Sequence, residues 1–203
     1  MNLANTRNHR SMQKQKSTLV IHPSDPSTDC LKAIYENRDW TVIRDFDASP
    51  EYIAGQIGKH DRIVLLGHGT SEGLMAGSML PLPSGEEVFF QFTHYIVSKS
   101  EAPLLKEKET ISIWCHSDAF FRKYQAGTGL HTGMIISEVG EELYCLGDAV
   151  LDEEEMAKNM ELFCGTFAKY IDLPPQEMKK KVLDEYVGDD EVTRFNRERI
   201  IVL

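Results

Sequence analysis

The stretch Ile63-Val64-Leu65-Leu66-Gly67-His68-Gly69-Thr70 decides the fold that we expect for this chain of 203 residues. Four branched apolar residues run directly into a Gly-His-Gly sequence. A continuous apolar run that stops at a glycine is typical of a buried parallel strand followed by a tight loop. We therefore expect His68 at the carboxyl end of a strand, which is where open α/β sheets gather ligands and catalytic groups.

A second unit of the same design, Ile111-Ser112-Ile113-Trp114-Cys115-His116-Ser117, lies further along the chain. Before it, apolar runs at 17–22, 40–43 and 62–66 alternate with amphipathic segments, which predicts a parallel sheet with right-handed crossovers. In a doubly wound sheet of order 2-1-3-4-5, the strands that end at His68 and Cys115 are neighbours. Their side chains would then lie about 5–10 Å apart, given a strand spacing of ~4.8 Å.

The remaining segments are expected to complete a single α/β domain over 17–203. Residues 1–16 are polar, without the apolar segment of a secretory signal, and predict a mobile tail. The other expected elements are helices beginning at Thr28-Asp29 and Ser49-Pro50, a long substrate-side loop at 71–84, an ambiguous strand or helix at 88–92, a strand at 111–114, a helix at 118–124, a fifth strand at 134–136, C-terminal helices beginning at Asp152 and after Pro174-Pro175, and an edge strand at 199–203.

The composition argues against several classes of protein. The net charge is −10 with the acidic residues spread along the chain, which argues against a nucleic-acid surface and against adhesion to anionic membranes. No segment approaches the 18 or so consecutive apolar residues of a transmembrane helix. The four cysteines lack paired spacing, so we expect reduced thiols and a cytoplasmic location.

A thiol beside an imidazole predicts nucleophilic catalysis. His68 would favour or accept the proton of the Cys115 thiol, which activates the sulfur as a nucleophile. Gly69 has no side chain, so its N–H can point into the site and form an oxyanion hole with the N–H of Cys115. The reaction class would be acyl transfer, most simply amide hydrolysis through a thioester.

The two motifs resemble those of metacaspases. Gly67-His68-Gly69-Thr70 is similar to their histidine loop, and Cys115-His116-Ser117 is similar to their cysteine loop, in which His-Ser-Gly follows the nucleophile. Both motifs follow apolar strands, and the histidine precedes the cysteine. The resemblance implies a caspase-like three-layer α/β sandwich, a peptidase-like dyad of Cys115 and His68 without a cofactor, and a peptide or small-molecule substrate. His116 would then be a loop residue and not the base.

Two positions depart from the metacaspase pattern. Ile113 stands where metacaspases carry an acidic residue that helps to bind a basic side chain of the substrate. Asp118 stands in place of the glycine after His-Ser.

Further residues are expected near the same sheet edge. His22 ends the first predicted strand and Glu138 follows the fifth, so either can orient His68 or contact the substrate. Thr70 and His116 are further candidates for substrate contact. The alternative for His22 is that it caps the following loop, and the alternative for Glu138 is that it opens the next helix.

Two other functions fit the same residues. One is a catalytically inactive caspase-fold module that binds a peptide or a small ligand. The other is metal-dependent hydrolysis, although no HxH, HxxxH or CxxC spacing supports it. The ligands available to a metal would be His22, His68, Cys115, His116, Asp118 and His131.

Overall fold

The computed structural model describes residues 16–81, 87–148 and 150–203. The predicted tail at 1–16 lies outside these residues except for Lys16. That lysine forms an ion pair with Glu109.

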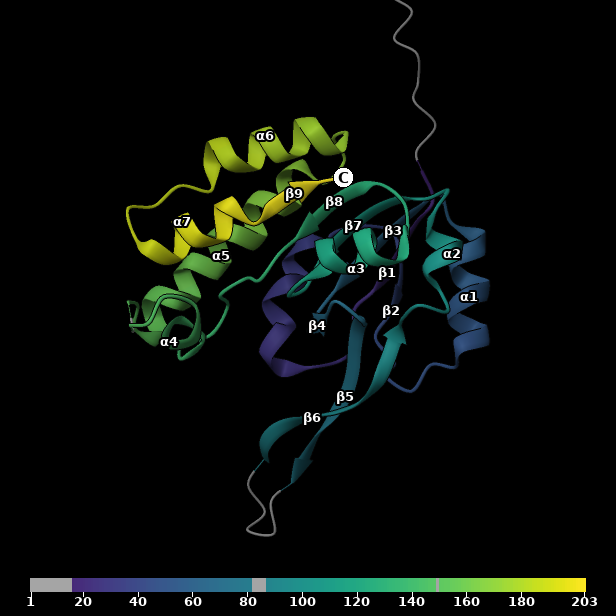
Figure 1. Cartoon of the computed structure of the whole chain (residues 1–203), viewed down its shortest axis with the longest axis horizontal. Coiled ribbons are helices and arrows are strands. Elements are labelled where there is room, and N and C mark those ends of the chain that lie inside the picture. Colours follow the sequence, from purple (N-terminus) through teal and green to yellow (C-terminus); the bar gives the residue numbers. More distant parts are fainter. Residues whose placement is uncertain (1–15, 82–86, 149) are drawn as a thin grey trace, which may run out of the picture.

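A six-stranded sheet forms the centre of the fold (Figure 1). Its strands are β1 (Thr18–Ile21), β2 (Thr41–Ile43), β3 (Arg62–Leu66), β7 (Glu109–Ile113), β8 (Gly129–Thr132) and β9 (Ile200–Val202). The order is β2-β1-β3-β7-β8-β9, in which all pairs are parallel except the last. The predicted α/β fold with a mostly parallel central sheet is therefore confirmed, and β3 and β7 are neighbours.

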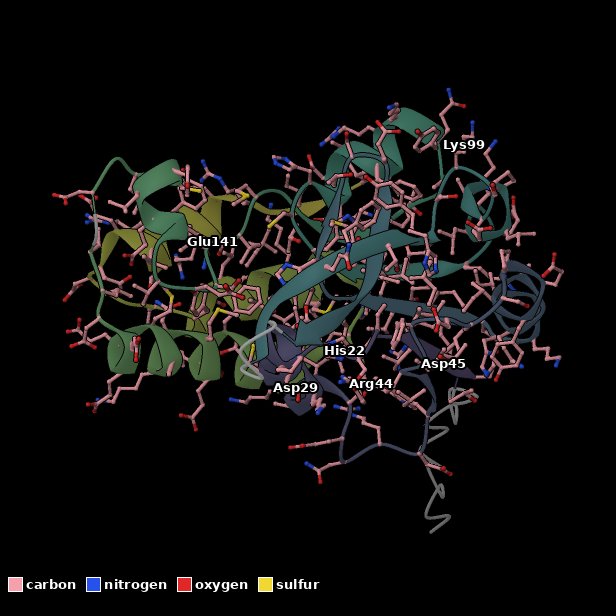
Figure 2. The ribbon with its side chains drawn as sticks, turned by 90° about the horizontal axis from the view of Figure 1, so that it is seen from below. His22, Asp29, Arg44, Asp45, Lys99 and Glu141 are labelled. Atoms are coloured by element: carbon pink, nitrogen blue, oxygen red, sulfur yellow. The ribbon has the colours of Figure 1, made fainter. Side chains whose placement is uncertain are left out.

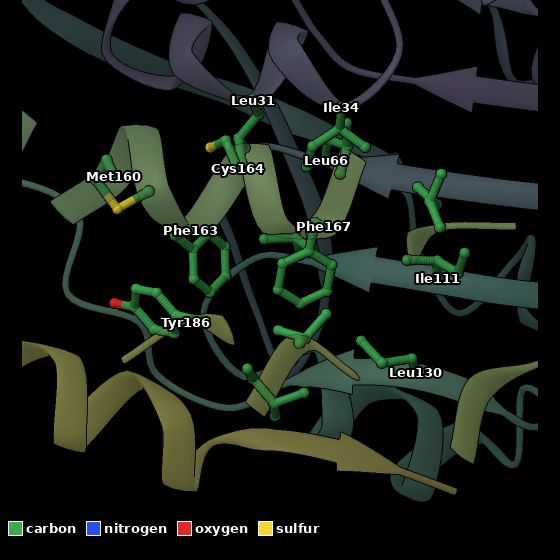
Figure 3. Close-up of a cluster of buried hydrophobic side chains, with 14 of the residues drawn as sticks. Leu31, Ile34, Leu66, Ile111, Leu130, Met160, Phe163, Cys164, Phe167 and Tyr186 are labelled. Atoms are coloured by element: carbon green, nitrogen blue, oxygen red, sulfur yellow. The ribbon is translucent and has the colours of Figure 1, made fainter. Parts of the chain in front are cut away.

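Helices cover both faces of this sheet, because alternate residues of each parallel strand point to opposite sides. Val20, Val64 and Leu66 face a core formed with η1 (Pro26–Ile34), α5 (Glu153–Tyr170), α6 (Pro175–Glu185) and α7 (Glu191–Glu198) (Figure 3). Leu19 and Leu65 face a second core formed with α1 (Pro50–Lys59), α2 (Ala102–Leu105) and α3 (Ser117–Tyr124). The result is three layers.

Local sequence signals fix where several helices begin. Ser49 caps α1, since its side chain accepts a hydrogen bond from the N–H of Tyr52, and Pro50 occupies the first turn. Asp152 and Glu155 form a reciprocal capping box at the start of α5. These two helix starts confirm the predictions made from sequence.

The predicted loop at 71–84 is wrong over its described residues. The chain instead forms β4 (Gly69–Thr70), β5 (Gly73–Pro81) and β6 (Glu87–Val97), in which β5 pairs antiparallel with β4 on one side and with β6 on the other. In Figure 1 the β5–β6 hairpin extends away from the central sheet. The many Gly, Pro and Ser residues of this segment have little local preference for a strand, so the sequence did not indicate β5. Pairing with the distant segment β6 stabilises it instead.

The predicted strand at 134–136 is also wrong, because the fifth parallel strand is β8, which ends at Thr132. Ile135 and Ile136 are buried in the loop that follows. The side chain of Asn196 takes the place of a neighbouring strand there, since it accepts a hydrogen bond from the N–H of Ile136 and donates one to its carbonyl, each at 2.8 Å. A short helix, α4 (Glu141–Cys145), comes next.

The interior also contains a histidine with an incomplete set of partners. His131 is fully buried on β8, where Nδ1 lies 2.7 Å from Ser112 Oγ and Nε2 has no hydrogen-bond partner. Its ring stacks on Phe121 at a centroid distance of 3.9 Å. Burial, with a smaller effect of Arg122, lowers the pKa of His131 to about 3, so this imidazole is neutral in the folded protein at pH 7.

The folded protein should therefore lose stability as the pH falls from about 6.5, the usual histidine pKa, towards 3. Over this range the unfolded chain binds a proton at His131 that the folded chain does not bind. His131→Leu should flatten the dependence of the urea-unfolding free energy on pH. Leu130→Ala, on the same strand, should lower stability equally at every pH. An unchanged slope in His131→Leu would contradict this assignment.

Candidate active site

Cys115 lies in a sharp turn between β7 and α3. The turn is tied to the end of β8 by Thr132, whose hydroxyl accepts a hydrogen bond from the N–H of Trp114 and donates one to its carbonyl. Ser117 is fully buried and donates to the carbonyls of Ser112 and Thr132. His116 has a left-handed backbone with φ 68°, which is uncommon for a residue with a side chain. These contacts hold Cys115 directly before the first turn of α3.

His68 lies in the loop between β3 and β4. Gly67 adopts φ 134°, a conformation that favours glycine, and its N–H donates to the carbonyl of Ile113. The ring of Trp114 packs directly against Gly69, where an added Cβ would meet Trp114 Cδ1 at 2.1 Å. Trp114 Nε1 also donates to the carbonyl of Thr70 at 3.1 Å. The histidine loop and the cysteine loop are thus packed and hydrogen-bonded to each other.

Asp25 and Ser27 hold one nitrogen of the His68 ring. Nε2 lies 3.2 Å from Asp25 Oδ2 and 2.8 Å from Ser27 Oγ. The Ser27 hydroxyl donates to both Asp25 oxygens at 3.0 Å, so it accepts from the imidazole. This pattern assigns the ring proton to Nε2, because the carboxylate can only accept.

The same carboxylate begins a helix. Asp25 is the N-cap of η1, and its Oδ1 accepts a hydrogen bond from the N–H of Ser27. The side chain of Asp25 is only 4 % exposed, whereas that of His68 is 28 % exposed. A buried and locally fixed carboxylate thus orients an imidazole that remains open to the surface.

The electrostatics of the pair follow from this contact. The hydrogen bond to Asp25 raises the pKa of His68 above its usual value, against the opposite effect of burial. Burial alone would raise the pKa of Asp25, but its hydrogen bonds with His68 and Ser27 outweigh that effect and lower it. Asp25 is therefore ionised at neutral pH.

The Cys115 thiol is in a less polar environment. Its Sγ donates to the carbonyl of Ile135 at 3.6 Å, in the loop that Asn196 holds. Burial raises the pKa of Cys115 to about 11, and the negative charges of Glu141 and Glu138 act in the same direction. The resting thiol is therefore protonated at neutral pH.

His68 and Cys115 line one small pocket at the carboxyl ends of β3 and β7. The pocket is bounded on one side by η1, through Ser27 and Leu31, and on another by Met160 of α5. The structure therefore brings together the two residues that the sequence predicts as nucleophile and base.

The other predicted site residues lie in different settings. His22 is fully buried and lies near Arg44 (Figure 2). Its Nδ1 faces Tyr35 and Arg44, and its Nε2 faces Thr28. Burial, followed by the positive charge of Arg44, lowers the pKa of His22 to about 3. Both ring nitrogens of His22 are thus occupied by Tyr35, Arg44 and Thr28. Asp25 and Ser27, and not His22, orient the ring of His68.

The remaining predicted contacts are at the rim or in the turn. Thr70 contributes its hydroxyl to Tyr95 and to the N–H of Glu72, which stabilises the β4–β5 turn. His116 is exposed at the start of α3. Glu138 follows the pocket residue Ser137, and its Oε1 is buried without a hydrogen-bond partner.

Gly69, the predicted oxyanion donor, follows the pocket residue His68 but is not itself among the described residues that line the pocket. The N–H of Met75 donates to the carbonyl of His68, and Gly69 lies opposite Leu74 in the next pair of the ladder. Since bonded and non-bonded pairs alternate in antiparallel strands, the N–H of Gly69 points away from β5. That direction leaves it outside the β4–β5 ladder.

Asp25 and Ser27 are the site residues that the sequence analysis missed. A signal was present in Asp25-Pro26-Ser27, since aspartate before proline is a common helix start. The predicted start at Thr28-Asp29 lies inside η1, which begins at Pro26. Had the helix start been predicted at Asp25, its carboxylate would have been expected at the same edge of the sheet as His68.

Within the described residues, no group of three or more His, Cys, Asp or Glu side chains is arranged to hold a metal ion. None of the described helices has the length and apolar character needed to cross a membrane. Comparison with known proteins adds no assignment, because no protein family and no curated protein matches this sequence.

The contact between Gly69 and Trp114 can be tested through stability. Gly69→Ala should lower the free energy of unfolding by about 1–3 kcal/mol, because the new methyl group forces Trp114 to move. Gly58→Ala in α1 is the matched control. Its Cβ would meet nothing within 4 Å, so it should raise stability by about 0.5–1 kcal/mol. Urea unfolding measures both, and a Gly69→Ala protein as stable as the wild type would disprove the packing argument.

Proposed function

We propose that this protein is a cysteine hydrolase that cleaves an amide through a thioester on Cys115, with His68 as its base. The observation that carries the proposal is that both residues line one pocket while Asp25 fixes the His68 ring. A caspase-like fold is part of the proposal. It is supported by the two loops that follow neighbouring parallel strands and by the helices on both faces of the sheet.

The geometry suggests a role for each group. With Nε2 protonated and directed to Asp25 and Ser27, Nδ1 is the ring atom that would take the thiol proton. The sulfur would attack the carbonyl carbon, and the N–H groups of Gly69 and Cys115 would stabilise the oxyanion. His68 would then protonate the leaving amine, after which water, activated by the same nitrogen, would hydrolyse the thioester.

The high pKa of the thiol determines when its proton moves. Burial raises the pKa of Cys115 to about 11, which disfavours a standing thiolate–imidazolium pair, even though Asp25 raises the pKa of His68 and so favours the imidazolium. We infer that proton transfer accompanies the attack on the acyl group. Reactivity then requires neutral His68 and increases as the pH rises through the raised pKa of that imidazole.

A binding module without catalysis is the second candidate. It is favoured by the same protonated thiol, whose hydrogen bond is directed at the carbonyl of Ile135. This module would use the pocket to hold a ligand and would not depend on His68 as a base.

Alkylation by iodoacetamide separates the two candidates. Cys30 must first be replaced by serine, because it is exposed and the hydrogen bond from Cys164 lowers the pKa of its thiol. In this background, His68→Ala should slow alkylation of Cys115 by about a hundredfold, which is the usual size of general-base assistance. Mass spectrometry of the labelled peptides measures the rates at Cys115 and Cys145 together.

His60→Ala, at the end of α1, is the control variant and should leave both rates unchanged. The rate at Cys145 should not respond to His68→Ala. Equal rates at Cys115 with and without His68 would exclude the hydrolase mechanism and leave the binding module.

Asp25→Asn tests the orienting carboxylate. Asparagine is an equally good N-cap, so η1 should remain folded. Loss of the charge should lower the pKa of His68 and move the alkylation profile of Cys115 to lower pH. An NMR titration of the His68 ring protons measures the pKa directly.

Ser27→Ala is the matched control for this titration. It removes the hydroxyl but keeps the carboxylate that holds Nε2. The His68 pKa should stay above its usual value in Ser27→Ala. An unchanged His68 pKa in Asp25→Asn would show that Asp25 does not set the protonation of the base.

A further inference from the structure

We propose that the pocket beside Cys115 is a specificity pocket for a short, uncharged apolar side chain on the acyl side of the bond that is cleaved. This inference rests on the proposed hydrolase function and names its class of substrate. The preferred substrate would carry a residue the size of valine next to the reacting carbonyl.

Apolar side chains from three elements form the walls. Leu31 comes from η1, Ile113 from the end of β7 and Met160 from α5. Figure 3 shows Leu31 and Met160 within the same cluster of buried side chains. Ile135 and Trp114 also line the pocket, next to Cys115. A chain entering this space loses water and gains apolar contacts, which favours hydrocarbon.

The size of the cavity limits the length of that chain. Its volume is about 30 Å³, enough for roughly two to three water-sized groups. We therefore expect the isopropyl group of valine to enter this space more readily than the larger ring of phenylalanine. Met160 is the wall residue chosen for truncation, because it lies on α5, outside the sheet and away from η1, whose first residues hold His68.

The lining also disfavours charge. Within the described residues, neither Lys, Arg, Asp nor Glu lines the pocket, and its polar members are hydroxyl, thiol and imidazole groups. A charged side chain would lose its hydration there without gaining an opposite charge. Two acidic groups lie next to the lining. Asp25 contacts His68 and Ser27, and Glu138 follows Ser137 and raises the pKa of both His68 and Cys115. Their negative charges would repel an acidic side chain and are the competing reason to favour a basic one, and Glu138 is the one of the two that does not orient His68.

Four chloromethyl ketone probes test this inference in the full chain with Cys30→Ser. Each is an N-acetyl-aminoacyl chloromethyl ketone, with valine, phenylalanine, lysine or aspartate as the residue next to the reactive carbon. The second-order rate of Cys115 labelling should be at least about tenfold higher for the valine probe than for each of the others. A lysine or aspartate probe as fast as the valine probe would overturn the proposal.

Variants of α5 and of Glu138 make the test specific. Met160→Ala should raise the phenylalanine rate about tenfold relative to valine. Leu162→Ala, exposed on the same helix and outside this pocket, should leave the ratio unchanged. Glu138→Gln should not alter the order of the four rates. An unaltered ratio in Met160→Ala, or a lysine preference that Glu138→Gln abolishes, would refute the apolar pocket.

The iodoacetamide experiment distinguishes failure of the specificity pocket from failure of the proposed hydrolase function. If His68→Ala does not slow alkylation of Cys115, the hydrolase mechanism fails and the specificity pocket fails with it. If alkylation depends on His68 but the four probes react at equal rates, the mechanism stands and the specificity pocket alone is excluded.

Discussion

The parallel register between β3 and β7 is the constraint on which the candidate site depends. Leu66 lies opposite Ile113, so the residues two positions further on, His68 and Cys115, leave the sheet at the same edge. A slip of one residue would turn the side chains of one strand to the other face. Since Leu66 and Ile113 are both buried in one core, such a slip would expose or misplace them. Hydrophobic burial thus enforces the alignment that brings the thiol and the imidazole to one pocket.

Register alone places two residues but does not orient their side chains. Orientation comes from polar groups on other segments: Asp25 at the start of η1 for His68, and Thr132 and Asn196 for the loops around Cys115. These contacts are buried or partly buried, where an unpaired partner is costly, so they restrain the loops strongly. The sheet thus brings the backbones of His68 and Cys115 close together, and the polar contacts orient the His68 ring and the loops around Cys115.

The sequence predicted the parts of this arrangement that have local or periodic signals. The run at 62–66 and the capped helix starts at Ser49 and Asp152 are of this kind. Strand β5 was missed because its stability comes from pairing with β6. Asp25 was missed because the contact with His68 joins two loops distant in sequence, and no periodic pattern reports such a contact. Ile135 and Ile136 have strand-like side chains, but their backbone is held by Asn196.

Burial acts in two ways at this site, and the two are linked. The apolar walls that exclude water from the pocket also raise the pKa of the Cys115 thiol to about 11. Asp25 raises the pKa of His68, and the charges of Glu138 and Glu141 raise both. In the absence of substrate the thiol keeps its proton at neutral pH, because its pKa is about 11. A site built for a standing thiolate would place positive charge near the sulfur, whereas here the negative charges of Glu141 and Glu138 act on it. This arrangement suits a base that removes the thiol proton while the carbon–sulfur bond forms. The negative charge then moves from the sulfur to the carbonyl oxygen, where the oxyanion donors can stabilise it.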